Sequence, residues 1–329
     1  MTILPRIRQI SSLLLITTLL TACGSDDGDT PETESGPMGT MSIDITDAPL
    51  DEASHLFVRI TGLELKPKNG ESLEFIFCNR HLIKIDEDCL NQTTLELDLM
   101  TLTGKVSHAL SDKRAIPAQQ YNWIRLKLDG ANPGHIKLTS TGDTEYPLTI
   151  PSGAQTGLKI NTQLSLQEGH DLRLTIDFDL RKSVHKTGNG KYMLRPTLRL
   201  VDNSHIGHLS GTVDSSLLAT EDCSPAIYLY EYTLPPAESE LFFWPIADDI
   251  HPDNHELITT TYPVYNKGSG IYEYEIGFIT EGDYFVAFTC SAIDDDPAED
   301  DNINIHLPYP VEIEAGQETT HNFVTLILP

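Results

Sequence analysis

The chain has 329 residues, of which 39% are hydrophobic and 7% aromatic, and its formal net charge is −27 at pH 7. This acidity, with no cluster of Lys or Arg along the chain, excludes a nucleic-acid partner bound through a basic surface and argues against electrostatic attachment to anionic lipid. The length is sufficient for two domains, each with a core of its own.

The N-terminus has the layout of an export signal. Arg6 and Arg8 precede an apolar block at residues 10–20 that is too short to span a bilayer. The next residues, Leu-Thr-Ala-Cys, resemble a bacterial lipobox. By this resemblance residues 1–22 are a lipoprotein signal peptide and Cys23 carries palmitate and further acyl chains, because one chain alone anchors a protein weakly. The alternative is an ordinary secretory peptide in which Cys23 occurs by chance.

The lipobox resemblance also implies a location. Gly24 stands where lipoproteins of the inner membrane have Asp, which implies the outer membrane, facing the periplasm or the cell surface. Residues 23–38 are acidic and rich in Gly, Pro and Ser. Such a segment cannot bury a core, so we expect the acylated Cys to be followed by a disordered tether.

Four Cys follow Cys23, at 78, 89, 223 and 290. An even number in an exported chain predicts disulfides, and four Cys permit three pairings. We expect Cys78–Cys89 and Cys223–Cys290, because each proposed domain then closes its own pair. A zinc site is disfavoured, since no Cys-x-x-Cys occurs.

Alternating apolar and polar residues predict β-strands along the first part of the chain, at 41–47, 55–66, 122–129, 158–166, 172–180 and 191–201. The sequence Thr-Gly-Asn-Gly at 187–190 predicts a tight hairpin between the last two. The pattern restarts near residue 203, with seven short strands at 208–214, 225–232, 256–265, 270–279, 282–290, 303–314 and 320–328. The predicted fold class is all-β, with two antiparallel β-sandwiches at 39–203 and 204–329.

Both predicted domains resemble known families. The stretches GTMSIDITDAP, VRITGLELK, IPAQQYNWIRLKLD and LTIDFDLRKSVHKTGNGKYMLRPTLRLV resemble the bacterial lipoprotein domain known as domain of unknown function 4382. That resemblance implies an exported, lipid-anchored β-sandwich and no particular reaction. The stretches SGTV, AIYLYE, YEYEIGFITEGDYFVAFTC and VEIEAGQETTHNFVT are similar to a carboxypeptidase-regulatory or transthyretin-like sandwich with a carbohydrate-binding-like fold, which implies a fold rather than a function.

Asp177 and Asp179 lie in a stretch that resembles part of the family-18 chitinase signature. On a strand they project from one face, roughly 6.5–7 Å apart. We expect this face to be exposed, so that both carboxyls would ionise. The position of the catalytic acid holds Arg181, which cannot donate a proton at useful pH. Arg195 and Arg199 have the polar parity of the partner strand, so a structural Asp–Arg ladder is the simpler interpretation.

A strongly acidic run follows Cys290 and offers hard oxygen ligands that suit Ca²⁺. Its carboxylates are Asp294, Asp295, Asp296, Glu299, Asp300 and Asp301. The run lacks the EF-hand spacing, and a plain solvated loop is the alternative. Calcium is the only cofactor that the sequence indicates.

No nucleophile, phosphate-binding or metalloprotease motif occurs in the chain. We therefore expect a protein of the cell envelope that is not an enzyme and that binds a glycan or another envelope protein. The alternatives are a purely structural envelope lipoprotein and, third, a glycan-active hydrolase.

Overall fold

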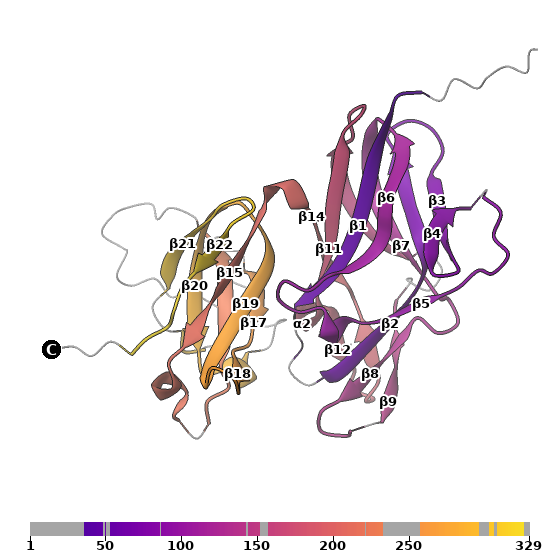
Figure 1. Cartoon of the computed structure of the whole chain (residues 1–329). Helices are drawn as coiled ribbons and strands as arrows, with labels where there is room; N and C mark the ends of the chain where they lie inside the picture. The colour runs from indigo at the N-terminus through magenta and orange to yellow at the C-terminus, as the bar shows by residue number, and fades with distance from the viewer. Residues whose placement is uncertain are drawn as a thin grey trace, which may run out of the picture. The chain divides into compact units, whose positions relative to one another are not determined.

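The structure is a computed structural model that describes residues 36–48, 50, 53–85, 87–142, 144–151, 157–220, 222–232, 257–295, 303–305 and 308–325 (Figure 1). These residues belong to one compact unit, Gly36–Pro329. The predicted signal peptide and Cys23 lie outside the described residues. Within the described part, no helix has the length and apolar character needed to cross a lipid bilayer.

In the described residues from 36 to 205, the chain forms fourteen strands and three short helices. The strands are β1 (Met38–Ala48), β2 (Ala53–Pro67), β3 (Leu73–Cys78), β4 (His81–Lys84), β5 (Leu95–Asp98), β6 (His108–Pro117), β7 (Gln120–Leu128), β8 (Gly134–Leu138), β9 (Glu145–Thr149), β10 (Leu158–Ser165), β11 (Asp171–Asp179), β12 (Val184–Lys186), β13 (Tyr192–Leu194) and β14 (Thr197–Asp202). The helices are η1 (Leu99–Thr101), α2 (Leu180–Ser183) and η2 (Asn203–His205).

These strands form a sandwich, called here the first sandwich. One sheet has the order β14-β11-β1-β6, and the other follows β10-β7-β2-β8-β9-β13-β12, with β3 and β5 also on β2 and β4 on β3. Alternate residues such as Ile43, Ile45 and Leu126 turn inward and bury one continuous apolar core. Most strand pairs are antiparallel, but β1 and β11 are parallel over Thr40–Ala48, so this sheet is mixed rather than purely antiparallel.

The second part of the chain forms a second sandwich. Its elements are β15 (Ile206–Val213), η3 (Ser215–Leu218), β16 (Ala226–Glu231), β17 (Leu257–Thr261), β18 (Val264–Asn266), β19 (Ile271–Thr280), β20 (Gly282–Thr289), η4 (Ala292–Asp294), β21 (Tyr309–Ile313) and β22 (Glu318–Thr320). The sheets have the orders β18-β19-β15-β22 and β17-β16-β20-β21. The all-β sandwich architecture confirms the predicted fold class.

The sheet β17-β16-β20-β21 is apolar on both faces. Ile227 and Leu229 of β16 face the core between the two sheets, whereas Tyr228 and Tyr230 project to the other side, where they are also fully buried.

The two predicted disulfides are confirmed: Cys78 is bonded to Cys89, and Cys223 to Cys290.

The predicted hairpin at 187–190 belongs to different strands from those expected. This turn joins β12 to β13 at the end of the larger sheet, while β11 pairs with β14 in the other sheet. After β11 the chain passes through the four residues of α2 and crosses to the larger sheet, where it forms β12 and β13. It then crosses back and forms β14, which pairs with β11. The last strand of the first sandwich ends at Asp202, and the first strand of the second begins at Ile206, close to the predicted boundary at 203/204. That the two sandwiches are separate domains that fold independently stays a prediction.

Candidate binding groove

A groove of about 680 Å³ lies on the β18-β19-β15-β22 sheet, within the size range of small-molecule sites. Most of the residues that line it carry a hydroxyl, amide or carboxylate group. The lining residues are Thr103, Gly104, Ser210, Gly211, Thr212, Thr261, Tyr262, Val264, Asn266, Glu273, Tyr274, Glu275, Thr320 and Asn322.

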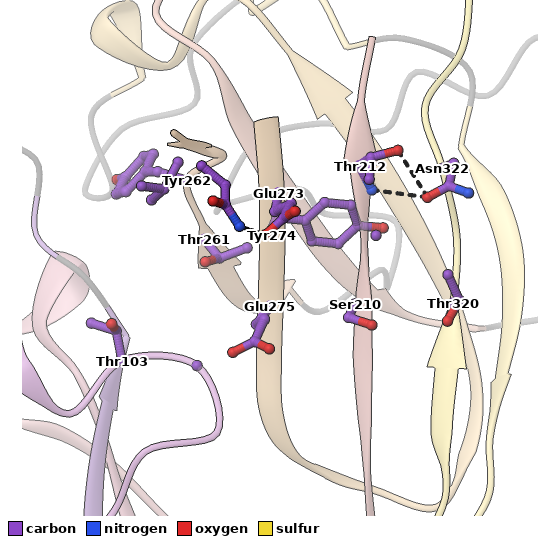
Figure 2. A pocket seen from close by; sticks show the side chains of 14 residues that line it. Thr103, Ser210, Thr212, Thr261, Tyr262, Glu273, Tyr274, Glu275, Thr320 and Asn322 are labelled. Atoms are coloured by element: carbon purple, nitrogen blue, oxygen red, sulfur yellow. Dashed lines mark hydrogen bonds between the residues drawn. The ribbon is translucent and has the colours of Figure 1, made fainter. Parts of the chain in front are cut away.

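The polar side chains form two rows across three neighbouring chain segments (Figure 2). Strand pairing places Ser210 opposite both Glu275 and Thr320, which makes the first row. Thr212 lies opposite Glu273 and hydrogen-bonds to Asn322, which makes the second row. Since residues two apart on a strand share a face, both rows point into the groove.

The second row depends on a close approach of two backbones. A Cβ on Gly211 would lie 1.6 Å from the carbonyl oxygen of His321, so only Gly fits there. The buried Tyr274 donates its hydroxyl to the same carbonyl at 2.8 Å, and burial raises the pKa of this phenol. Asn322 then accepts hydrogen bonds from the N–H and the hydroxyl of Thr212, at 2.9 and 3.0 Å.

Two acids at the groove, Glu273 and Glu318, are held as carboxylates. Glu273 accepts hydrogen bonds from Asn266 and Ser269, both at 2.8 Å, and these bonds lower its pKa. Glu318, beside the first row, accepts from Ser210 at 2.6 Å and from Lys105 at 3.0 Å, and its pKa is also lowered. Neither carboxyl can therefore supply a proton near neutral pH, as a glycosidase acid must.

A loop of the first sandwich closes one end of the groove. Thr46 on β1 donates its hydroxyl to the carbonyls of Leu102 and Val106, which fixes the loop between them. Lys105 in this loop lies 2.9 Å from Glu275 and 3.0 Å from Glu318, and hydrogen bonds from the ammonium to the two carboxylates raise the pKa of Lys105.

The loop can approach β19 closely because both chains have Gly at the contact. A Cβ on Gly277 would lie 2.1 Å from the carbonyl oxygen of Gly104. The two backbones therefore touch without a side chain between them, and this contact sets the position of Lys105 beside the groove.

The predicted Asp–Arg ladder forms in register at one rung. Arg199 lies opposite Asp177, and its Nε and Nη2 donate to the carboxylate at 2.9 and 2.5 Å. Asp179 faces Thr197 instead and accepts from the backbone N–H of Lys182, so it caps α2. Arg195 lies between β13 and β14, where its backbone N–H donates to Ser183.

The face that carries Asp177 is buried rather than exposed, contrary to the sequence interpretation. Asp177 and Arg199 lie against Thr259, Thr260 and Ile276 of the second sandwich. Burial raises the pKa of Asp177, and the Arg199 guanidinium offsets part of that rise. A carboxyl in this position has no access to a substrate.

The acidic run after Cys290 is described only as far as Asp295. Asp294 is exposed, but the side chain of Asp295 is buried and lies 2.6 Å from Arg181. The phenol of Tyr228 also donates to the Asp295 carboxylate. Asp295 is therefore committed to an internal ion pair, a role that the sequence interpretation as a calcium ligand missed.

The remaining proposed calcium ligands, Asp296, Glu299, Asp300 and Asp301, lie outside the described residues. Among the residues that the structure does describe, no three His, Cys, Asp or Glu side chains gather closely enough to hold a metal ion. Calcium binding by the run stays a prediction that rests on these four carboxylates and Asp294.

Sequence reasoning did not identify the groove. The alternation Ser-Gly-Thr at 210–212 and Glu-Tyr-Glu at 273–275 is visible in the sequence, but by itself it indicates only strands. The sequence around each strand does not show that the two strands pair, nor that their register places Glu275 opposite Ser210.

Comparison with known proteins gives one family match. Residues 38–196 match the model of a domain of unknown function, DUF4382. The transthyretin-like resemblance of the second sandwich stays a prediction, and no curated protein matches the chain.

Several solved structures are distantly similar. The Bacillus anthracis TIE protein is 10% identical over 87% of this chain and 34% of its own length, with a TM-score of 0.19, so this chain spans about a third of that protein. The minor pilin GBS52 of Streptococcus agalactiae is 11% identical over 88% and 99%, with a TM-score of 0.17. The tip fimbrial protein Mfa3 of Porphyromonas gingivalis is 10% identical over 84% and 81%, with a TM-score of 0.18.

At these TM-scores the structural likenesses carry no argument about function. The DUF4382 match covers just under half of the 329 residues and coincides with the first sandwich up to β13. Residues 38–196 are therefore similar to this domain family, and the described second sandwich, from β15 onward, lies outside the matched region.

Proposed function

We propose that this chain is a lipid-anchored, non-catalytic protein of the cell envelope that binds a neutral glycan in the groove. The observation that carries the proposal is the pair of polar rows, Glu275–Ser210–Thr320 and Glu273–Thr212–Asn322. Vicinal hydroxyls of a sugar can donate to carboxylates and amide oxygens and accept from hydroxyl and amide donors, and both kinds of group line this groove.

The charge of the groove supports a neutral ligand. Glu273 and Glu318 are ionised, Glu275 lies in the first row, and Lys105 is the single cation among these four groups. Their sum, one positive and three negative charges, gives −2, which repels uronic acids and phosphorylated sugars. The same ionised carboxyls support a binding role over hydrolysis.

Calorimetric titration with neutral oligosaccharides, chosen from a glycan array, tests the proposal. We expect binding that Glu273→Gln and Asn322→Ala each weaken at least about tenfold, equivalent to about 1.4 kcal/mol. Glu312→Gln is the matched control, because Glu312 is an exposed acid on β21 in the opposite sheet. If no array glycan binds, or if the groove variants bind like the control, the glycan proposal fails.

A protein contact at the β18–β19 hairpin is the second candidate. Val264, Tyr265 and Ile271 are 69%, 50% and 44% exposed, and β18 is an edge strand in the described sheet. Apolar side chains beside an open strand edge favour pairing with an extended segment of another protein. Cross-linking in the envelope through a photoreactive residue at 265, with position 312 as the control, tests this; equal cross-linking at both would exclude the hairpin.

A further inference from the structure

A second hollow, of about 510 Å³, lies on the first sandwich between the β3–β4 hairpin and strand β6. Strands β4 and β6 are in contact at this place. Three cations and one carboxylate line it: Arg80, Lys113, Arg114 and Asp112. With His81 neutral, the lining has a charge of 3 − 1 = +2, in a chain whose net charge is −27.

Arg80 occupies a strained position at the edge of this hollow. Cys78 pairs with His81, so Asn79 and Arg80 form a two-residue turn, with φ angles of 50° and 71°. Asn and Gly suit both positions of such a turn, whereas Arg in the left-handed region is unfavourable. Strain of this kind occurs often at binding sites, where the surrounding structure maintains it.

The surrounding structure does hold this turn in place. The backbone N–H of Arg80 donates to the Thr93 hydroxyl at 3.1 Å, and that of Asn79 donates to the carbonyl of Asn91 at 3.1 Å. The Cys78–Cys89 disulfide closes the same loop. The position of Arg80 is therefore imposed by its neighbours and not by its own conformational preference.

The Arg80 guanidinium is available to a ligand. Within the described residues it makes no ion pair and no hydrogen bond, whereas Lys113 lies 3.0 Å from Asp171 and Arg114 lies 3.4 Å from Glu87. The side chains of the Lys113–Asp171 pair are 60% and 36% exposed, and such a pair is weak enough for a competing anion to displace. Arg114 is 30% exposed and also donates to the carbonyl of Leu82, so it is held in place beside the hollow. In addition, β6 is an edge strand, so its outer side presents main-chain groups that the sheet does not use.

We propose that this hollow binds a phosphate group, held by the Arg80 guanidinium with Lys113 and Arg114 beside it. A planar guanidinium can donate two parallel hydrogen bonds to phosphate, and flanking cations add charge without fixing geometry. The phosphate can belong to a phospholipid headgroup or to a soluble compound. This site is separate from the glycan groove and does not depend on it.

Thermal unfolding of the full chain in millimolar sodium phosphate, against sodium chloride of equal ionic strength, tests the site. We expect a higher midpoint in phosphate, because a ligand that binds only the folded state stabilises it. Arg80→Gly should abolish the phosphate response and raise the midpoint in chloride, since Gly relieves the left-handed strain. Lys113→Gln should reduce the response, and Lys68→Gln, on the neighbouring β2–β3 turn, should leave it unchanged.

Equal midpoints in the two salts for the unsubstituted chain would overturn the proposal, as would a full phosphate response in Arg80→Gly. A residue that only supports the fold would lose stability on substitution, so a lower midpoint of Arg80→Gly in chloride also contradicts it.

Flotation with vesicles distinguishes the two sources of the phosphate. It is done with the Cys23→Ser chain, so that no acyl chain contributes, using phosphatidylglycerol vesicles and phosphatidylcholine vesicles as the neutral comparison. Selective flotation with phosphatidylglycerol that Arg80→Gly removes identifies a lipid headgroup. A phosphate-dependent midpoint without such flotation identifies a soluble phosphate compound.

Discussion

The guanidinium of Arg181 and the carboxylate of Asp295 form a buried ion pair, with Nη2 and Oδ2 2.6 Å apart and side chains 5% and 0% exposed. Arg181 belongs to α2 of the first sandwich, and Asp295 follows η4 of the second. The Arg181 guanidinium also lies 5.7 Å from the ring centre of Tyr228, whose hydroxyl donates to Asp295. This pair joins the two sandwiches through a buried polar contact.

Substitution of Asp295 should destabilise the folded chain strongly. Asp295→Ala leaves the Arg181 charge buried without its partner, and breaking a buried pair in this way costs about 3–5 kcal/mol. The measurement is urea unfolding of the full chain. Asp294→Ala is the control, because Asp294 is exposed and such surface changes stay within about 0.5 kcal/mol. Equal losses in the two variants would show that the ion pair contributes nothing specific.

The calcium hypothesis needs variants that leave the Arg181–Asp295 pair intact. We expect millimolar CaCl₂ to raise the unfolding midpoint above that in NaCl of equal ionic strength, because a bound ion stabilises the folded state by mass action. Asp300→Asn with Asp301→Asn should remove this difference. Identical curves in the two salts would leave the acidic run as solvated surface charge.

The two disulfides should differ in their contribution to stability. In the chain-entropy model, a bridge with a sequence separation of 67, as in Cys223–Cys290, contributes about 4 kcal/mol, and one with a separation of 11, as in Cys78–Cys89, about 3 kcal/mol. Replacement of Cys223 and Cys290 by Ser should therefore lower the unfolding free energy more than replacement of the other pair. The opposite order would mean that local effects outweigh loop closure.

Gly277→Ala should separate the Lys105 loop from β19. The new Cβ would lie 2.1 Å from the Gly104 carbonyl oxygen, and this atom is backbone that cannot rotate away. Overpacking of this kind typically costs about 1–3 kcal/mol. Gly188→Ala is the control, since nothing lies within 4 Å of a Cβ there. Unfolding midpoints and glycan binding are measured for both, and an unchanged Gly277→Ala protein would contradict the contact.

Stability should fall as the pH drops below about 6.5, the ordinary pKa of His. Burial lowers the pKa values of His208 and His321, so both are neutral in the folded state while the unfolded chain takes up protons. The Nδ1 of His208 accepts the N–H of Phe278 at 3.3 Å, which a protonated ring cannot do. Unfolding free energies at pH 7.5 and 5.5 measure the effect, and His208→Gln should reduce the loss.

His205 opposes this trend and serves as the internal check. Glu281 raises the pKa of the exposed His205, so its contribution to stability is present at low pH and is lost as the pH rises through the raised pKa. His205→Gln should therefore steepen the loss between pH 7.5 and 5.5. A flatter profile in this variant would contradict the assignment.

The strands were largely predictable because the alternation of apolar and polar residues within a short stretch of sequence indicates a strand. The alternation in residues 55–66 and 172–180 placed β2 and β11 closely, since period-2 burial depends only on which face meets a core. The pairing of the four Cys was predictable for a similar reason, because each pair falls within one run of strands. The first rung of the ladder, Asp177 with Arg199, followed from parity.

Contacts between distant segments could not be predicted in this way. The sequence of α2 does not show that Arg181 meets Asp295, nor does the turn at Asn79 show that Arg80 faces β6. The alternation in the sequence shows that one face of this strand packs in the core of the first sandwich, and it therefore predicts that the face of Asp177 is exposed. In the structure the second sandwich covers that face.

The amino-acid sequence alone therefore determined the all-β class, the approximate strands, the disulfide pairs and the expectation of an envelope protein without a catalytic motif. Only the tertiary structure decided the register that aligns Glu275, Ser210 and Thr320, the burial of Asp177 and Asp295, and the cationic hollow at Arg80. Strand identity depends on neighbours a few residues away, whereas register and burial depend on segments far apart in the chain, whose packing is a property of the whole fold.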